Sequence, residues 1–250
     1  MIDAYAFYQC DKLNNIILPK NIKTIKSYAF FHCDSLVNIY IPDSIVEISR
    51  KAFSNSGYYN NSENWTNGIL YINNHLISTD NNITECSIKD GTITIANETL
   101  CSYSGGENIK TIYIPKSVEY IGEDCFKYYL STTIDIYYDG YKKEWEELIS
   151  ATYTLDSFEK INIHCLPPSI STELINNIFV VTPKGVENGN RIIIVCYNGD
   201  KMVYVNPYIY AGETTIPFTT TETYDKVKVM VWENLETCMP LCEVENVPLN

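Results

Sequence analysis

Acid–base or nucleophilic chemistry in this chain would depend on its three histidines and its carboxylates. A catalytic serine or cysteine needs a neighbouring base that a third group orients. His32 and His75 have no such motif around them, and the sequence has no G-x-S-x-G, phosphate-binding loop or G-x-G-x-x-G. Glu144 and Glu147 lie on a predicted helix, where a solvated face explains them. We therefore predict that the protein is not an enzyme and has no catalytic residues.

Metal binding or disulfide formation would depend on the nine cysteines. Cys238 and Cys242 are separated by three residues, and His164 is followed by Cys165. A tetrahedral zinc site needs four converging ligands, and no other histidine lies near either pair. We therefore predict no metal ion and no cofactor. If the protein is exported, a disulfide between Cys238 and Cys242 is the alternative.

The elements that position these residues repeat along the chain. Three segments with the pattern Ile-x-x-x-Ala-Phe follow one another with a period of about 23 residues. They are residues 2–7, 25–30 and 48–53. A second pattern, (Leu/Ile)-x-x-Ile-x-(Leu/Ile)-Pro, begins at Leu13, Leu36 and Ile109. Cys10 and Cys33 occupy the same repeat position, so we interpret them as small side chains packed inside a coil; the alternative is a disulfide or a row of thiols.

Each copy has the properties of one coil of a solenoid. Ile39 and Ile41 alternate inward on a short strand, and Pro42 ends that strand because proline has no N–H to donate. A second short extended piece follows. The Ala29-Phe30 pair then forms the corner of the coil, and the phenylalanine ring fills its interior. Because a single copy cannot bury its apolar face, the copies must stack. The sequence therefore predicts a mainly β solenoid of short strands and turns.

The repeat over residues 25–42, Ile-x-x-x-Ala-Phe-x-x-Cys-x-x-Leu-x-x-Ile-x-Ile-Pro, resembles the BspA-like (Treponema-type) leucine-rich repeat. Residues 64–72 are similar to a variant repeat of bacterial surface proteins in that family, and 137–145 are similar to its terminal repeat. The resemblance covers about residues 1–165 and implies a leucine-rich-repeat solenoid. It also implies a secreted or surface-anchored bacterial protein that serves in adhesion or partner binding and has no catalytic residues.

The solenoid is expected to end in a cap. Residues 141–150 are predicted to form a short helix with Trp145 and Ile149 on one face, and 161–163 alternate as a last strand. Such a segment covers an end that would otherwise expose core residues and strand edges.

Paired prolines within 166–169 mark the boundary between two predicted domains, 1–165 and 166–250. In the second domain, residues 198–200 (Asn-Gly-Asp) are a hairpin signal between two β-rich runs. The β-rich runs cover 178–181, 191–197, 201–210, 214–219 and 226–233. Their number and spacing favour a β-sandwich of immunoglobulin or fibronectin type. This domain is similar to small modules appended to surface proteins of gut Firmicutes.

The charge balance narrows the range of partners. The chain carries 18 Lys/Arg against 31 Asp/Glu, with 13 against 21 up to Cys165 and 5 against 10 after it. Because no basic stripe can neutralise phosphates, we predict no binding to nucleic acid or to an anionic membrane surface. No apolar run reaches the roughly 20 residues of a membrane span, and the first residues lie inside a repeat without a secretion signal. We expect a piece of a longer protein, which the family resemblance implies is extracellular or at the cell surface.

One row of positions is the predicted binding site. It is formed by the residue between the two inward positions of each strand, and in stacked copies these side chains project about 4.8 Å apart from one sheet face. In chain order the row is Ile17, Tyr40, Tyr71, Ser87, Tyr113 and Asp135. Tyrosine offers apolar area with a polar tip, so we predict contact with a protein or glycoprotein partner. The alternative is that tyrosine simply suits a pleated strand.

Two other functions stay open. The loop that carries Tyr58, Tyr59 and Trp65, or the second domain, could stack on sugar rings of a polysaccharide or a cell wall. Alternatively, the repeats are a structural spacer that presents an upstream domain. Binding by the isolated halves separates the first two functions, and the absence of any ligand favours the spacer.

Overall fold

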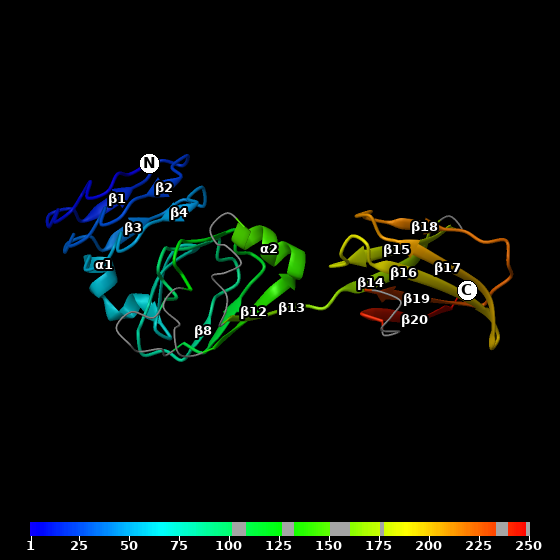
Figure 1. The fold of residues 1–250 in the computed structure, drawn as a ribbon. Helices are drawn as coiled ribbons and strands as arrows, with labels where there is room; N and C mark the ends of the chain where they lie inside the picture. Colours follow the sequence, from blue (N-terminus) through cyan, green and yellow to red (C-terminus); the bar gives the residue numbers. More distant parts are fainter. Residues whose placement is uncertain (102–108, 127–132, 151–160, 176–177, 234–239, 249–250) are drawn as a thin grey trace. The chain divides into compact units, whose positions relative to one another are not determined.

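The computed structural model describes residues 1–101, 109–126, 133–150, 161–175, 178–233 and 240–248. The chain forms two compact units. The first, which we call the repeat unit, contains Met1–Gly140 and Glu144–Cys165. The second, which we call the C-terminal unit, contains Tyr141–Lys143 and Leu166–Asn250. Both are built mainly from β-strands (Figure 1).

The first copies of the repeat unit stack as parallel coils (Figure 1). Their strands are β1 (Asn15–Ile17), β2 (Thr24–Ile25), β3 (Asn38–Tyr40) and β4 (Glu47–Ile48). β1 pairs with β3 so that Ile16 lies opposite Ile39, and β2 pairs with β4 so that Ile25 lies opposite Ile48. In each pair, the two partners occupy the same position of successive repeats, which confirms the predicted period.

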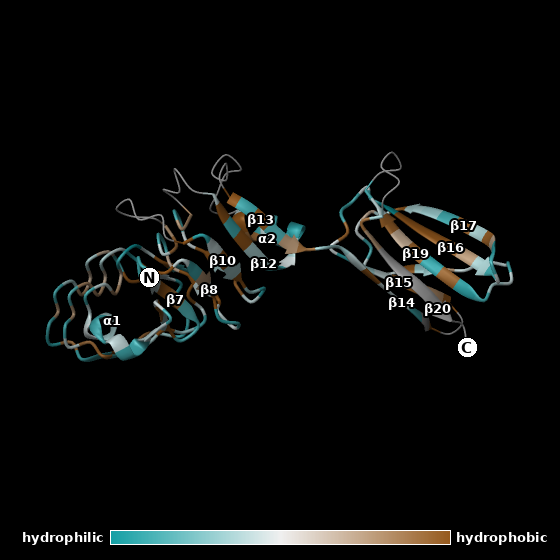
Figure 2. Cartoon of the chain, turned by 90° about the horizontal axis from the view of Figure 1, so that it is seen from below, coloured by the Kyte–Doolittle hydropathy of each residue, from teal (hydrophilic) through white to brown (hydrophobic). Residues whose placement is uncertain are grey.

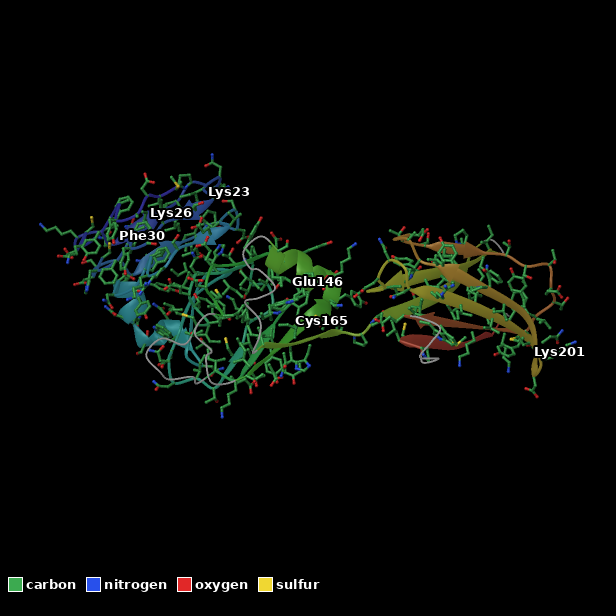
Figure 3. The ribbon with its side chains drawn as sticks, in the orientation of Figure 1. Lys23, Lys26, Phe30, Glu146, Cys165 and Lys201 are labelled. Atoms are coloured by element: carbon green, nitrogen blue, oxygen red, sulfur yellow. The ribbon has the colours of Figure 1, made fainter. Side chains whose placement is uncertain are left out.

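The predicted corner of each coil is buried as expected. Phe30, which is labelled in Figure 3, is fully buried between two equivalent phenylalanines. Its ring centroid lies 5.0 Å from that of Phe7 and 5.2 Å from that of Phe53, and the three rings are nearly parallel. Ala29 and Ala52 are buried beside them, because only a small side chain fits where successive coils turn.

Each corner uses the same backbone conformation. The residue before the alanine of the corner has a positive φ of 60° at Tyr5, 59° at Tyr28 and 53° at Lys51. Glu98 and Asp124 repeat it with 58° and 57°. The left-handed region is costly for side chains that carry a Cβ, by about 1 kcal/mol or more per residue. The stacked packing of the coils therefore holds a turn that an isolated copy would not keep.

A hairpin interrupts the regular coils. Its strands belong to a five-stranded sheet of order β11-β9-β7-β6-β5. The strands of that sheet are β5 (Trp65–Thr66), β6 (Ile69–Ile72), β7 (His75–Thr79), β9 (Thr94–Ile95) and β11 (Tyr120–Ile121). A short helix α1 (Gly57–Asn60) and the 3-10 turn η1 (Ser62–Asn64) lead into β5. Asn73 and Asn74 form the turn of the hairpin, because Ile72 pairs with His75 and Asn73 takes a φ of 54°.

The last part of the repeat unit is a four-stranded sheet of order β13-β12-β10-β8. Its strands are β8 (Glu85–Ser87), β10 (Thr111–Ile114), β12 (Ile134–Tyr141) and β13 (Ile161–Leu166). The predicted helix is confirmed as α2 (Lys142–Ser150), which buries Trp145 and Ile149 against the same core as this sheet. In Figure 3, Glu146 marks α2 and Cys165 marks β13.

The C-terminal unit consists of two antiparallel sheets, β14-β15-β18 and β17-β16-β19-β20. The first contains β14 (Ser169–Ile175), β15 (Ile178–Lys184) and β18 (Ile216–Phe218). The second contains β16 (Arg191–Asn198), β17 (Lys201–Ile209), β19 (Lys226–Trp232) and β20 (Cys242–Pro248). Phe179 and Phe218 of one sheet share a core with Ile192, Ile194 and Val229 of the other. Apolar residues dominate β16 (Figure 2).

The sequence identified five of these seven strands but missed two. The predicted hairpin between β16 and β17 is confirmed, with Asn198 opposite Lys201, and Lys201 marks its tip in Figure 3. β14 and β20 were not predicted, because polar residues interrupt the apolar pattern of both strands.

Candidate functional site

The site that the structure supports lies on the outward face of the sheet β13-β12-β10-β8. In each strand, residues whose side chains enter the core alternate with residues that face solvent. The outward residues are Glu85 and Ser87; Thr111 and Tyr113; Asp135, Tyr137 and Asp139; and Asn162, His164 and Leu166. We call this set the tyrosine face.

Three rings form a stack across neighbouring strands of the tyrosine face. The centroids of Tyr113 and Tyr137 lie 5.1 Å apart, with 18° between the ring planes. Tyr137 stacks in turn on His164, with 4.4 Å between centroids and 14° between planes. Both tyrosines are 41% exposed, although Tyr113 stacks on one ring of this face and Tyr137 on two. Stacking limits the motion of the rings, so a partner that contacts them loses little further side-chain entropy.

A hydrogen-bonded carboxylate holds the end of this stack in place. His164 Nε2 lies 2.9 Å from Asp135 Oδ1, and Asn162 Nδ2 donates to the same oxygen at 3.1 Å. The hydrogen bonds from His164 and Asn162 lower the pKa of the Asp135 carboxyl, so it remains ionised. The imidazole ring is thereby fixed in the plane in which it stacks on Tyr137.

Two members of the predicted row were placed wrongly. Asp135 lies opposite Thr111, whereas Tyr137 lies opposite Tyr113 and so occupies the position predicted for Asp135. Tyr71 belongs to β6 in the other sheet, where it pairs with Leu76.

The surroundings of Tyr71 are those of a structural residue. Its hydroxyl accepts a hydrogen bond from the Lys89 backbone N–H at 3.1 Å, and its carbonyl accepts one from the Tyr58 hydroxyl at 2.9 Å. Burial raises the pKa of the Tyr71 hydroxyl. Tyr71 therefore has no place on the tyrosine face.

The remaining members of the predicted row form two separate groups. Ser87 and Tyr113 are paired as predicted, and both face solvent. Ile17 and Tyr40 are opposite each other in the two-stranded sheet β1-β3, and they are 85% and 53% exposed. The row is therefore interrupted by the hairpin, with an apolar pair before it and the tyrosine face after it.

The predicted sugar-stacking loop is only partly available for a ligand. Tyr58 packs against the core of the first coils and donates its hydroxyl to Tyr71, as described above. Tyr59 and Trp65 remain half-exposed, and their rings meet edge to face at a centroid distance of 5.2 Å. The Trp65 indole N–H donates to the Tyr59 carbonyl at 2.8 Å, which fixes the geometry of this pair.

The cysteines and histidines are dispersed. Among the described residues, no group of three or more metal-ligating side chains comes together. His164 and Cys165 point to opposite faces of β13, and Cys238 lies outside the described residues. Cys33 is buried, and its thiol donates to the Phe7 carbonyl at 3.0 Å, so it packs inside the coil as interpreted. For Cys10 the interpretation was wrong, because that side chain is exposed.

A cavity of about 340 Å³ lies beside the third corner of the repeat unit. Its lining includes Arg50, Thr79, Glu98 and Cys101. The Arg50 guanidinium and the Glu98 carboxylate are 2.9 Å apart, and the Thr79 hydroxyl donates to the Thr99 carbonyl at 2.6 Å. These groups engage one another across adjacent coils, so we interpret the cavity as a feature of coil packing.

Sequence reasoning missed Tyr137 and His164 as site residues. Tyr137 follows Tyr113 at almost the same interval that separates Ile17 from Tyr40, so a search at the repeat period would have found it. His164 had no such signal, because an irregular interval separates β13 from the preceding strand.

The parallel, in-register coils of the repeat unit define a β-repeat protein, and its open site is a sheet face without a catalytic constellation. The family described as BspA type leucine rich repeat region (6 copies) matches residues 1–134. The chain belongs to this family of BspA type leucine-rich-repeat proteins, which is a non-catalytic repeat family. No curated protein and no solved structure matches the chain.

Within the described residues, no helix combines the length and the apolar character that a membrane span requires. Repeats of this family suggest a protein-binding repeat protein.

Proposed function

We propose that this chain is an extracellular or cell-surface binding protein whose tyrosine face contacts a protein or glycoprotein partner. The observation that carries the proposal is the stack of Tyr113, Tyr137 and His164 on an open sheet face. Exposed aromatic residues that are already ordered by their neighbours are typical of binding hot spots. BspA type repeat proteins are typically secreted or found at the cell surface, which supports the location.

The proposal includes the architecture in which the face is presented. Residues 1–165 form a leucine-rich-repeat solenoid closed by α2 and β13, and 166–250 form an immunoglobulin-like or fibronectin-like β-sandwich. The parallel register of the repeats and the shared core of the two C-terminal sheets support these assignments.

A binding screen of the intact chain against matrix proteins and a polysaccharide panel tests this function. The variant Tyr113→Ala/Tyr137→Ala removes the stack, and Tyr8→Ala/Tyr120→Ala removes two tyrosines of similar exposure, each 39%, from other surfaces. We expect the first variant to weaken a protein interaction by about 2 kcal/mol, roughly thirtyfold in Kd, while the control keeps the affinity of the parent chain. Equal loss in both variants would contradict the proposal.

The second candidate function is carbohydrate binding at Tyr59 and Trp65. Their edge-to-face pair leaves aromatic surface half-exposed in a fixed geometry, which suits stacking on a sugar ring. A polysaccharide signal that survives Tyr113→Ala/Tyr137→Ala and disappears in Trp65→Ala supports this candidate instead. No binding to either panel favours the spacer.

A further inference from the structure

Cys10 and Cys33 occupy the same position of two stacked coils, and both are free thiols in this structure. The backbones of the two coils are hydrogen-bonded beside them, where the Gln9 N–H donates to the Phe31 carbonyl at 2.9 Å. Strands and coils paired in this way lie about 4.8 Å apart. A disulfide joins residues whose Cα atoms are about 4.4–6.8 Å apart, so the spacing of the coils suits a bond between these two positions.

The Cys33 thiol reaches across the boundary between the two coils. It donates to the Phe7 carbonyl at 3.0 Å, and the Cys10 N–H donates to the same oxygen at 3.2 Å. Burial raises the pKa of the Cys33 thiol, whereas a hydrogen bond from the Cys10 backbone lowers it. The Cys33 sulfur therefore lies against the backbone of Cys10, and rotation about the Cα–Cβ bond of Cys10 brings the second sulfur toward it.

The two thiols differ in their access to solvent. Cys10 is exposed, whereas Cys33 is fully buried in the second coil. A reagent in solution therefore meets Cys10 first. Because Cys33 lies on the protein side of Cys10, its sulfur approaches from the interior while a group bound to Cys10 leaves toward solvent.

We propose that Cys10 and Cys33 form a disulfide that fastens the first coil to the second when the chain meets a small oxidised disulfide such as oxidised glutathione. The Cys10 thiolate attacks one sulfur of the reagent, breaks its S–S bond, and forms a mixed disulfide as the first glutathione thiolate leaves. The Cys33 thiolate then attacks Cys10 Sγ and displaces the second glutathione thiolate. The two protons of the protein thiols pass through solvent to these thiolates, so the protein loses two electrons and the reagent gains two.

The first coil is held less firmly than the second, so a covalent bond has an effect there. Phe7 and Leu13 are only partly buried, whereas their equivalents Phe30 and Leu36 are fully buried. Weakly buried segments open locally, and a bond that closes a loop restricts such opening. The inference is independent of the tyrosine face, although an extracellular location favours the bond because that environment is oxidising.

Oxidation of the intact, folded chain in a buffer of reduced and oxidised glutathione tests the proposal. After acid quenching and blocking of the remaining thiols, trypsin digestion without reductant releases residues 1–12 and 27–50, each of which contains one cysteine. We expect mass spectrometry to find these two peptides joined, at the sum of their masses less two hydrogen atoms. Treatment with a reductant should separate them.

Two substitutions and a matched control assign the roles of the thiols. Cys10→Ser, at the exposed position, should abolish the link. Cys33→Ser should leave Cys10 as a mixed disulfide with glutathione, because the second thiol is missing. The control Cys86→Ser removes an equally buried thiol that lies opposite Ile112, and it should keep the link. Circular dichroism of each variant shows that it is folded.

Hydrogen exchange measures the effect of the bond on the first coil. The N–H groups of Phe7 and Gln9 donate to carbonyls of the second coil. We expect both to exchange about tenfold more slowly in the oxidised parent chain than in the reduced chain. In Cys10→Ser, the same oxidising buffer should leave their exchange rates unchanged.

Three results would overturn the inference: a mixed disulfide at Cys10 that never passes to Cys33 in the folded parent chain, a link that forms only in urea, or a link between Cys10 residues of two copies. Equal exchange rates in the oxidised and reduced parent chains would show that the bond does not fasten the first coil. Because none of these results involves the tyrosine face, the proposed function is tested separately.

Discussion

Tyr113 lies directly opposite Tyr137 in the parallel register of β10 and β12, and their rings stack with 5.1 Å between centroids. Because the rings cover each other's faces, they present edges and hydroxyl groups to solvent. Aromatic edges are electropositive, and a phenol hydroxyl both donates and accepts hydrogen bonds. Such a surface matches the carbonyl groups and aromatic faces of a protein better than the flat side of a sugar ring, which stacks on an open aromatic face.

The phenylalanine stack should carry a large share of the stability of the first coils. Phe30 is fully buried between Phe7 and Phe53. We expect Phe30→Ala to lower the free energy of unfolding by about 3–5 kcal/mol, because it leaves a cavity between two coils that cannot collapse around it. Urea unfolding followed by circular dichroism measures this loss. Phe31→Ala, at the half-exposed neighbouring position, is the control, and an equal loss there would contradict a special role for the stack.

His75 should make the fold sensitive to mild acid. It is fully buried, neither ring nitrogen has a well-formed hydrogen bond among the described residues, and burial lowers its pKa. At a pH below the ordinary histidine pKa of about 6.5, the unfolded chain therefore binds a proton at His75 that the folded chain does not. The free energy of unfolding consequently falls as pH falls.

We expect His75→Leu to remove about 1 kcal/mol of the stability difference between neutral pH and pH of about 5.5, as measured by urea unfolding at the two pH values. His32→Gln, at a half-exposed histidine, is the matched histidine substitution against which the change in His75→Leu is compared. If His75→Leu keeps the pH dependence of the parent chain, burial of His75 is not the cause.

The thiols should differ sharply in reactivity. Cys10 is exposed, whereas burial raises the pKa of Cys86 to about 12 and that of Cys196 to about 11. Because the thiolate is the reactive form, iodoacetamide at mildly alkaline pH should modify Cys10 and spare Cys86 and Cys196. Peptide mass spectrometry measures the modified fraction at each site, and all three should react in urea. Rapid modification of Cys86 in the folded chain would contradict the packing of β8.

Asp135 should report on the integrity of the tyrosine face. Hydrogen bonds from His164 and Asn162 lower the pKa of its carboxyl. Their contribution to the stability of the fold is therefore present when the pH is above the ordinary carboxyl pKa, and it is lost as the pH falls through the lowered pKa of the folded chain. We expect His164→Ala to raise the pKa of Asp135 toward its usual range. A carbon-detected NMR titration of the carboxyl measures the shift, with Asp139, on the same strand, as the internal reference. An unchanged Asp135 titration would place the His164 contact elsewhere.

The regular parts of the repeat unit could be predicted because one side-chain period fixes them. Ile25, Ala29 and Phe30 recur one period later as Ile48, Ala52 and Phe53, and only stacked coils bury all three types at once. The position of Tyr71 could not be predicted in this way. Its strand carries inward-facing residues like the others, but it pairs antiparallel with β7. That pairing depends on contacts between the Asn73 turn and a neighbouring coil, where Asn73 Oδ1 accepts a hydrogen bond from the Ile41 N–H.

The error at Asp135 has a different cause. The repeat pattern needs two inward-facing apolar residues in β12, and two choices fit it: Ile134 with Ile136, or Ile136 with Tyr138. Because side chains alternate with a period of two in both cases, the sequence alone does not distinguish the choices. Ile136 lies opposite Ile112 and Tyr138 lies opposite Ile114, so a buried tyrosine takes the place of an isoleucine. Tyr138 is accommodated by Trp145 of α2, whose ring centroid is 5.5 Å away. That contact arises only after the helix folds onto the sheet.

The most direct test of the central claim is the ratio of dissociation constants between the parent chain and Tyr113→Ala/Tyr137→Ala for the protein partner found in the screen. Biolayer interferometry with the intact, folded chains gives this ratio, and Tyr8→Ala/Tyr120→Ala provides the baseline. If the tyrosine face is the binding surface, the first variant binds roughly thirtyfold more weakly and the second binds like the parent chain. Equal affinities for all three chains would show that the partner contacts another surface.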